Sequence, residues 1–283
     1  MYSFRVRRHI RETRTTFVYF VKAGETITPT DMGAIQRANF HVYNVITLCL
    51  TEEEIAALAD LLCDAGLDDD QFADKVIEAD NFACYRFYLT GALGVGKSTT
   101  TSQLRNLVVL DEWAEPRLPL LAKAWDTLTP DEKQQVDSWI ANQFRIKNDG
   151  LRHKRFGISL IDRPPIDPLA FTPEKERPAK AKLLLDTICP GDKWEIAEGA
   201  VILLPGDPKE LAARVLVTGR PGYTADKLAQ MEINLKSVYH GEGVRVVDTR
   251  GRSVAEVTKT LSEIIHFEDY KPFNFTESLK VIK

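Results

Sequence analysis

Cysteine is scarce in this sequence, and long apolar runs are missing from it. The 283 residues include four cysteines, which lie far apart and form no C-x-x-C pair. This spacing argues against a disulfide framework and against a zinc site, and it is typical of reduced thiols in a cytoplasmic protein. The apolar segment 16–21 is far shorter than the ~20 residues that a membrane helix needs. We therefore expect a cytoplasmic protein with no signal peptide, no membrane helix and no membrane partner.

A large excess of charge of one sign is also missing. Lys and Arg number 37 against 41 Asp and Glu, which gives a formal net charge of −4. A nucleic-acid partner is therefore not favoured, although a local basic patch would still allow one. The apolar share of 44% is ordinary for a globular protein, and the length suffices for one large α/β domain with a smaller appendage.

A glycine-rich loop stands between a short apolar strand and a helix-compatible segment. Residues 87–90 form the apolar run, and residues 91–98 read GALGVGKS, which matches the P-loop pattern G-x-x-x-x-G-K-S. Glycines allow successive backbone N–H groups to point at one phosphate chain, and the helix adds its positive N-terminal end. We expect Lys97 to reach the β- and γ-phosphates of ATP and Ser98 to ligate Mg²⁺. The expected nucleotide-binding residues are Gly91, Ala92, Gly94, Val95, Gly96, Lys97, Ser98 and Thr99.

Carboxylates follow the next predicted strand, residues 108–110, in the stretch DEWAEPR. Ligands of a doubly wound sheet bind beyond the carboxyl ends of its strands. Glu112 is the first choice and Glu115 the second, with Asp111 behind both, for a side chain that orients or deprotonates a phosphoryl acceptor. Arg117 could hold an anionic acceptor. The structural alternative is that these carboxylates cap a helix that begins near Pro116.

A second polar stretch, DRPPID, follows the predicted strand 156–161. Asp162 would stand beside the P-loop and hold Mg²⁺ through water, together with Ser98. Arg163 would present its planar guanidinium to a phosphate or to the substrate. A structural salt bridge is the alternative for Asp162 and Arg163.

Three residues farther along the chain complete the expected site. Gln143, beside the apolar stripe of the helices predicted within residues 118–150, could reach a base or a phosphate, but the neighbouring aromatic residues are favoured as core. Arg214 lies on a predicted helix and Arg220 in the loop after it, so that together they could close over a triphosphate as a lid. The other elements expected here are strands over 200–204 and 244–249 and helices over 209–215 and 254–265.

The first 80 residues precede the P-loop strand and are predicted to form a small α+β domain of unknown role. Residues 3–10 and 16–21 could pair as a hairpin, and helices are expected over 30–36, from residue 51 and over 71–79. The arginines of this hairpin are favoured as the solvated face of an edge strand over phosphate-binding residues. The expected parts are this domain over 1–80, a P-loop domain over 81–268 and a C-terminal tail over 269–283 that packs on the core.

From residue 85 to about residue 267 the sequence resembles the P-loop nucleoside and nucleotide kinases. The deoxynucleoside kinase and thymidylate kinase group is nearest, and related kinase-like P-loop ATPases are also similar. GALGVGKS, DEWAEPR, DRPPID and the stretch GDPKELAARVLVTGRPGY before VVDTRGRS carry the resemblance. It implies a P-loop NTPase of the α/β class, a three-layer sandwich with a central parallel sheet. The resemblance implies that Glu112 or Glu115 corresponds to the family's acceptor carboxylate. It also implies that Asp162 and Arg163 correspond to the family's D/E-R motif, and that Arg214 and Arg220 correspond to its lid arginines.

These features predict an ATP- and Mg²⁺-dependent phosphotransferase that acts on a nucleoside or a nucleoside monophosphate, with a deoxy form favoured. Its partners would be a nucleoside triphosphate and a small-molecule acceptor, and a homodimer remains open. Two alternatives also remain open. One is an NTP-hydrolysing switch whose N-terminal domain binds a partner, and the other is a kinase for nucleic-acid ends.

Overall fold

The structure is a computed structural model that describes residues 2–10, 12–22, 42–50, 84–104, 107–153, 157–192, 195–219 and 222–282. Contacts between residues divide the chain into two compact units. The smaller unit contains residues 1–85 and two short later segments, 154–158 and 265–267, and the larger unit contains the rest. The P-loop therefore belongs to the larger unit.

The smaller unit is built on a three-stranded sheet of the order β1-β2-β3. Its strands are β1 Tyr2–Ile10, β2 Glu12–Lys22 and β3 Val42–Leu50. β1 and β2 pair antiparallel, which confirms the predicted hairpin. β2 and β3 run parallel, and β3 is missing from the prediction. The helices expected between residues 30 and 79 lie outside the described residues.

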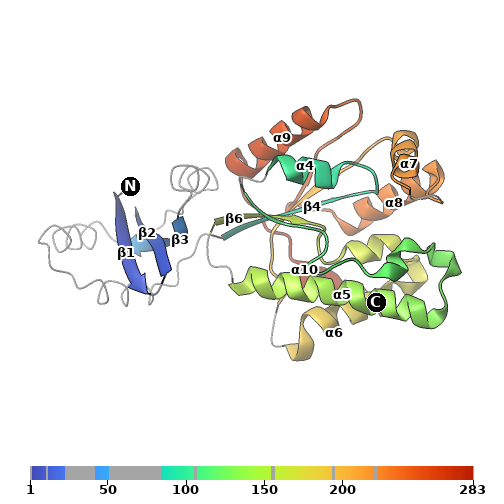
Figure 1. The fold of residues 1–283 in the computed structure, drawn as a ribbon, viewed down its shortest axis with the longest axis horizontal. Coiled ribbons are helices and arrows are strands. Elements are labelled where there is room, and N and C mark those ends of the chain that lie inside the picture. Colours follow the sequence, from blue (N-terminus) through green and yellow to red (C-terminus); the bar gives the residue numbers. More distant parts are fainter. Residues whose placement is uncertain are drawn as a thin grey trace, which may run out of the picture. The chain divides into compact units, whose positions relative to one another are not determined.

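A five-stranded parallel sheet forms the centre of the larger unit, in the order β5-β6-β4-β7-β8 (Figure 1). Its strands are β4 Cys84–Gly91, β5 Val108–Leu110, β6 Gly157–Asp162, β7 Ala200–Leu204 and β8 Val244–Val246. All residues of β7 are buried, as its continuous apolar run predicts. The chain leaves β4 toward one side of the sheet for β5 and β6, and it later crosses to the other side for β7 and β8. The carboxyl end of β4 is therefore the switch point at which such sheets bind ligands.

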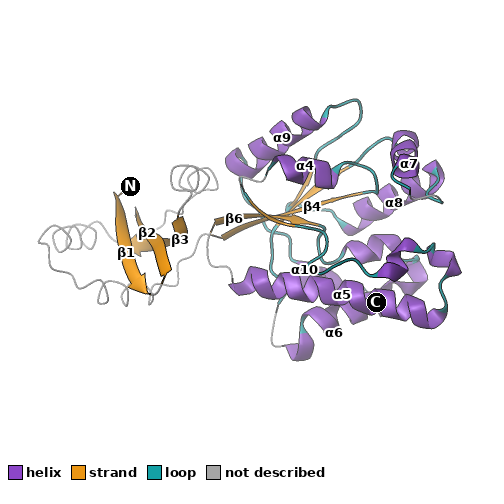
Figure 2. Ribbon diagram, in the orientation of Figure 1, coloured by secondary structure: helices purple, strands orange, loops and turns teal. Residues whose placement is uncertain are grey.

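Helices cover both faces of this sheet, so that the larger unit has three layers (Figures 1 and 2). They are α4 Lys97–Gln103, α5 Pro130–His153, α6 Arg177–Ile188, α7 Pro208–Val217, α8 Ala225–Val238, α9 Val254–Phe267 and α10 Phe275–Lys280. α4 and α9 lie on one face, and α5 and α6 lie on the other (Figure 1). At the start of α7, the Asp207 side chain accepts hydrogen bonds from two backbone amides. The predicted α/β class, with three layers around a central parallel sheet, is confirmed.

One segment differs from the prediction. Residues 118–128, expected to be helical, form two short 3-10 helices, Pro119–Ala122 and Trp125–Thr127. The backbone is extended between them, and Leu128 is the one buried apolar side chain of this described segment. Without a buried apolar face, tertiary packing cannot stabilise a continuous helix here. The remaining 3-10 helices are Asp167–Phe171, Glu174–Glu176 and Pro190–Asp192.

The C-terminal segment packs onto the central strand through aromatic side chains. Tyr270 contacts Phe87 edge to face at a centroid distance of 5.5 Å, and Phe275 contacts Tyr88 in the same manner at 4.8 Å. Phe275 is fully buried. Such aromatic pairs stabilise a core beyond the area they bury. The segment thus helps to hold β4, and with it the start of the P-loop.

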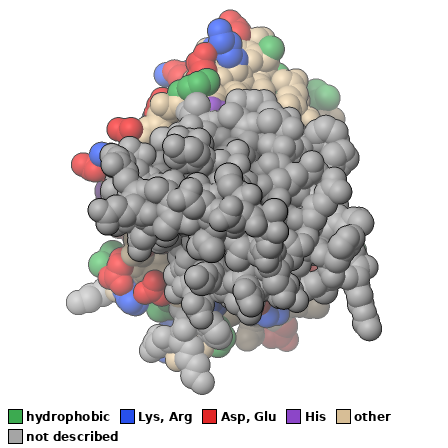
Figure 3. Space-filling model, turned by 90° about the vertical axis from the view of Figure 1, so that its left-hand side faces the viewer, with side chains coloured by type: hydrophobic (Ala, Val, Ile, Leu, Met, Phe, Trp, Pro, Cys, Tyr) green, Lys and Arg blue, Asp and Glu red, His purple; other side chains and the backbone are tan. Residues whose placement is uncertain are grey.

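The described surface mixes charges of both signs. On the face shown in Figure 3, described acidic and basic side chains lie interspersed along the rim. Exposed ion pairs such as Lys271–Glu242, at 2.9 Å, contribute little to stability because solvent screens them. Among the helices that the structure describes, none combines the length and the apolar character that crossing a membrane would require.

Candidate active site

The P-loop connects β4 to α4 and is held by close packing at two of its glycines. A Cβ atom on Gly94, which has a φ of 79°, would lie 2.8 Å from Val215 Cγ2 of α7. A Cβ atom on Gly91 would lie 2.6 Å from the carbonyl oxygen of Leu204 at the end of β7. Around Gly96, with a φ of 101°, no atom of the described residues would lie within 4 Å of such a Cβ. The loop is thus packed on its inner side and open at the start of α4, which suits a phosphate cradle.

Lys97 is the first residue of α4, and its side chain folds back over the loop. Its ammonium donates hydrogen bonds to the carbonyl oxygens of Gly91 at 2.8 Å and Ala92 at 3.2 Å. Burial, and to a smaller extent Arg163, lowers the pKa of Lys97 to about 8 against the attraction of nearby carboxylates. The N-cap residue, Gly96, provides no side-chain hydrogen bond, so the first amides of α4 have no cap. An anionic ligand would satisfy both the amides and the ammonium.

Ser98 and Asp162 meet at the end of β6. The Ser98 hydroxyl donates to Asp162 Oδ2 at 3.4 Å. Asp162 is buried, and its Oδ1 has no hydrogen-bond partner among the residues that the structure describes. Burial raises the pKa of Asp162, while Lys97 and Arg163 oppose that rise. A buried carboxylate oxygen without a partner, beside a hydroxyl and a phosphate loop, suits Mg²⁺, which prefers oxygen ligands.

The donor set for Mg²⁺ is small. The described residues contain no group of three or more His, Cys, Asp or Glu side chains that could hold a metal ion. Mg²⁺ typically takes one or two carboxylates and completes its octahedron with phosphate oxygens and water. Ser98 and Asp162 together meet this requirement only if a nucleotide provides further ligands.

Arg163 is buried, and two carboxylates hold its guanidinium. Its Nε donates to Glu112 Oε1 at 2.5 Å and its Nη1 to Asp167 Oδ2 at 3.0 Å. Burial would lower the pKa of Arg163, but Glu112, Asp167 and Asp162 together raise it above its ordinary value. Its φ of 66° is the left-handed conformation that non-glycine residues rarely adopt. Such strain persists where surrounding contacts enforce it, and it is concentrated at functional sites.

Asp167 links Arg163 to two other elements. Its Oδ1 accepts hydrogen bonds from Thr90 Oγ1 of β4 and from the Tyr239 hydroxyl after α8, both at 2.7 Å. Burial, and then Asp167, raises the pKa of Tyr239 well above its ordinary value, so the phenol is a neutral donor. Thr90 directly precedes Gly91. The network therefore joins Arg163 to the first residue of the P-loop, and sequence reasoning missed both Asp167 and Tyr239.

Gln143 and Glu115 form a separate cluster on the acidic loop. Gln143 is fully buried on α5, and its Oε1 accepts hydrogen bonds from the amides of Ala114 and Glu115, each at 3.0 Å. Its Nε2 donates to Glu115 Oε2 at 2.6 Å. Next to them, the Trp113 and Trp139 rings pack at a centroid distance of 5.0 Å. Gln143 therefore fixes the backbone of this loop and occupies the Glu115 carboxylate.

The remaining expected residues lie at the margin. Arg117 is exposed and donates to the carbonyl oxygen of Leu121 at 2.9 Å. Arg214 is exposed on α7, and its Cβ lies 3.6 Å from where a Cβ on Gly94 would stand, so α7 carries it beside the P-loop. Thr99 is exposed on α4, and Arg220 lies outside the described residues.

The sequence therefore names five side chains that the structure brings together, Lys97, Ser98, Glu112, Asp162 and Arg163. They lie at the carboxyl ends of adjoining strands, around a glycine loop that runs into a helix. The chain has the fold of a P-loop NTPase. Within this fold the carboxylate–arginine pair stands next to the phosphate loop.

Comparison with known proteins adds similar structures but no sequence relative. No protein-family model and no curated protein sequence matches this chain. A thymidylate kinase from Candida albicans is similar with a TM-score of 0.48 at 16% identity, over 69% of this chain and 100% of that one. A deoxyadenosine kinase from M. mycoides is similar in two structures, one with dCMP and dCDP and one with dATP. Both have a TM-score of 0.47, at 13% and 14% identity, over 63% of this chain and 97% of that one.

Proposed function

We propose that the protein is an ATP- and Mg²⁺-dependent phosphotransferase whose acceptor is a nucleoside or a nucleoside monophosphate. The observation that carries the proposal is the Glu112–Arg163 ion pair beside the P-loop lysine, together with an Asp162 oxygen that has no hydrogen-bond partner among the described residues. A protein that only binds a nucleotide needs the loop, but it has no need for a second carboxylate held next to Lys97. Phosphoryl transfer requires that carboxylate, because the acceptor must be oriented in line with the γ-phosphate.

ATP would lie with its phosphates on the open side of the loop, over Gly96 and the first amides of α4. Lys97 would exchange its hydrogen bonds to the Gly91 and Ala92 carbonyls for phosphate oxygens. Ser98 and Asp162 would hold Mg²⁺, which supplies positive charge between the phosphates when bound. Arg214 would add charge from α7, and Arg220 remains a proposal for the same task.

Glu112 is the better candidate for the acceptor carboxylate. It is close enough to Lys97 to influence the pKa of that lysine, and its side chain is 26% exposed, so an acceptor can reach it. Glu115 accepts a hydrogen bond from Gln143 and is not among the groups that shift the pKa of Lys97. A carboxylate can accept the proton of an acceptor hydroxyl, whereas it would repel the anionic oxygen of a monophosphate. The charge at this position therefore favours a nucleoside hydroxyl as the acceptor.

Arg163 would stabilise the transferred group. Its Nε and Nη1 are engaged by carboxylates, and its Nη2 makes no hydrogen bond with the described part of the chain. A guanidinium fixed in this manner presents a preorganised donor, which is effective because no reorganisation is needed as charge develops. It would contact the γ-phosphoryl oxygens as they move toward the acceptor.

The test is ADP release from ATP and Mg²⁺ with separate panels of nucleosides and nucleoside monophosphates, including deoxyadenosine and thymidylate. We expect one nucleoside to raise the rate by orders of magnitude and to be recovered as its phosphate. Glu112→Gln should lower kcat by about 10²- to 10⁴-fold, the usual contribution of a general base. Glu115→Gln is the matched control and should lower it far less. Slow ADP release that no acceptor changes would overturn the proposal in favour of an NTP-hydrolysing switch.

A further inference from the structure

Lys147 is a buried cation that the proposed reaction does not itself use. It lies on α5, is 6% exposed, and its ammonium stands 4.9 Å from the centroid of the Phe144 ring. Burial lowers the pKa of Lys147 to about 8, although nearby carboxylates oppose this. A buried ammonium is costly unless hydrogen bonds satisfy it. Its contacts therefore indicate what it does for the protein.

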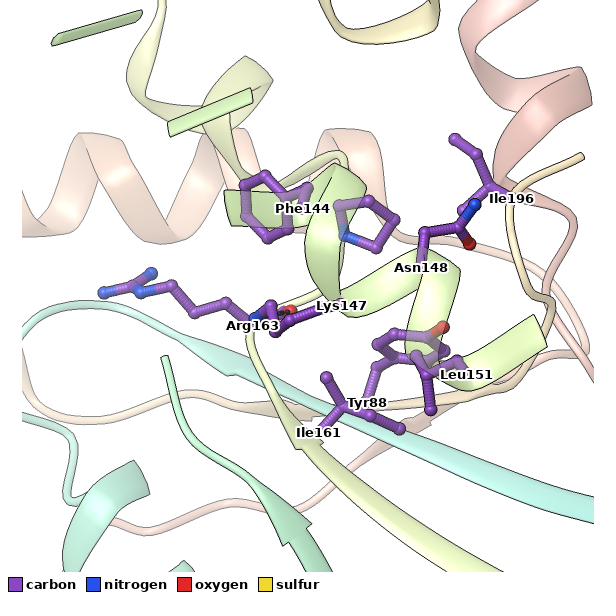
Figure 4. Close-up of a pocket in the computed structure, with 9 residues that line it drawn as sticks. Tyr88, Phe144, Lys147, Asn148, Leu151, Ile161, Arg163 and Ile196 are labelled. Atoms are coloured by element: carbon purple, nitrogen blue, oxygen red, sulfur yellow. Dashed lines mark hydrogen bonds between the residues drawn. The ribbon is translucent and has the colours of Figure 1, made fainter. Parts of the chain in front are cut away.

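The three donors of the ammonium are directed at main-chain carbonyl oxygens of the candidate active site. The distances are 3.2 Å to Glu112, 2.8 Å to Asp162 and 3.5 Å to Arg163. Glu112 follows β5, whereas Asp162 ends β6 and Arg163 follows it. One side chain from α5 thus joins the two loops that carry the acceptor carboxylate and the metal-binding carboxylate. Figure 4 shows Lys147 of α5 beside the backbone of Arg163.

The choice of carbonyl oxygens as partners has a chemical consequence. An ammonium bonded to the carboxylates themselves would compete with acceptor and metal for the same oxygens. Here the Asp162 Oδ1 has no partner in the described part of the chain, and the Glu112 carboxylate accepts from Arg163 instead. The three ammonium donors are used on the backbone, so Lys147 itself occupies no carboxylate oxygen of Glu112 or Asp162.

Lys147 also acts on the strained residue. The Arg163 amide donates to the Leu89 carbonyl at 3.0 Å, and its carbonyl accepts from Lys147. Both polar groups of this residue are therefore anchored while its φ is 66°. A left-handed non-glycine residue persists only when its surroundings enforce the conformation. The cavity next to it, lined by Tyr88, Phe144, Lys147 and Arg163 among others, measures only about 10 Å³, so water has little room to replace the ammonium.

We propose that Lys147 is a positioning residue that sets the distance between the Glu112 and Asp162 side chains by holding the backbone of both loops. This inference rests on the proposed phosphotransferase function. Lys147 makes no hydrogen bond to the P-loop among the described residues, so removing the ammonium should act mainly on the two loops that it holds. Phosphoryl transfer depends on alignment, and a displacement of ~1 Å can lower its rate by ~10²-fold.

The test compares Lys147→Met, Lys147→Gln and Lys147→Arg with Lys133→Met, a control that removes another lysine of α5. Affinity for ATP is measured by calorimetry in EDTA, without Mg²⁺, and kcat and the acceptor KM are measured at a temperature at which each variant is folded. We expect the affinity for metal-free ATP to stay within twofold of wild type, kcat lowered about 10²-fold in Lys147→Met, and partial recovery in Lys147→Arg. Lys133→Met should behave as wild type.

Three results would overturn the inference. Wild-type kcat in folded Lys147→Met would refute a positioning role, and joint loss of metal-free ATP binding and kcat would show a general structural role. Unfolding of all three variants would show that Lys147 is needed for the fold. If the wild-type protein itself phosphorylates no acceptor, the proposed function fails as well, and this outcome is distinguished by the wild-type arm alone.

Discussion

The hydrogen bond between Tyr239 and Asp167 can be tested by a double-mutant cycle. The Asp167 carboxyl is 1% exposed and accepts from Thr90, Tyr239 and Arg163. Tyr239→Phe removes one hydrogen bond to a charged group, which should cost about 1.5–3 kcal/mol of unfolding free energy. Asp167→Asn removes one partner of a buried ion pair and should cost about 3–5 kcal/mol.

The double variant should be less destabilised than the sum of the two single variants. In the Asp167→Asn background, Tyr239→Phe no longer removes a bond to a carboxylate, so a coupling free energy of about 1–3 kcal/mol is expected. Urea unfolding followed by tryptophan fluorescence is suited to this test. The four tryptophans lie between residues 113 and 194, so the signal reports on the larger unit.

Tyr223→Phe is the matched control, because this tyrosine is 39% exposed and its loss should change stability by less than about 0.5 kcal/mol. The slope of the unfolding free energy against urea should stay constant across the variants, which shows that each unfolds over the same surface. Additivity of the two single variants within about 0.3 kcal/mol would refute the reasoning, because residues in contact are expected to be coupled.

Three further predictions concern the loops of the site. Gly94→Ala should weaken ATP binding at least tenfold in calorimetry, because the φ of 79° disfavours a side chain and the new Cβ would lie 2.8 Å from Val215. Gly150→Ala is the control and should leave ATP binding unchanged, because no described atom lies within 4 Å of a Cβ at that position. The pKa of Lys97 is about 8, and bound phosphates favour its charged form, so Lys97 should take up a proton when ADP binds. In EDTA we expect an uptake of ~0.7 proton at pH 8.5 and ~0.1 proton at pH 7, measured by calorimetry in two buffers of different ionisation enthalpy. Equal uptake at the two pH values would contradict this prediction. Gln143→Leu should lower kcat more than ATP affinity, because Gln143 holds the amides of the acidic loop; unchanged kcat would argue against that role.

Local patterns predict much of this fold. The P-loop, the strand ends and the helix α5 each depend on residues close together in the sequence, where spacing and composition are informative. The same holds for Asp162 and Arg163, which follow a strand directly. Their roles in catalysis remain predictions, as do the domain boundaries.

Contacts between residues that are far apart in the chain could not be predicted from the sequence. Lys147 bonds to Glu112 across 35 positions, and Tyr239 bonds to Asp167 across 72. The sequence does show that Lys147 is a lysine within an apolar helix face, between Phe144 and Leu151, which indicates a buried charge. Its hydrogen-bond partners are backbone atoms, which cannot be predicted from the residue types. The sequence allows Gln143 to reach a base or a phosphate, but its amide group is directed at the acidic loop, because tertiary packing decides such orientations.

The central claim is that the γ-phosphoryl group of ATP passes to a small acceptor bound at Glu112. The most direct measurement uses ATP labelled in its γ-phosphate, incubated with Mg²⁺, the protein and a panel of nucleosides, followed by separation of the products. The account predicts that the label appears in one nucleoside monophosphate and that Lys97→Ala abolishes this transfer while the protein stays folded. Label that appears only as inorganic phosphate, whichever nucleoside is present, would contradict it.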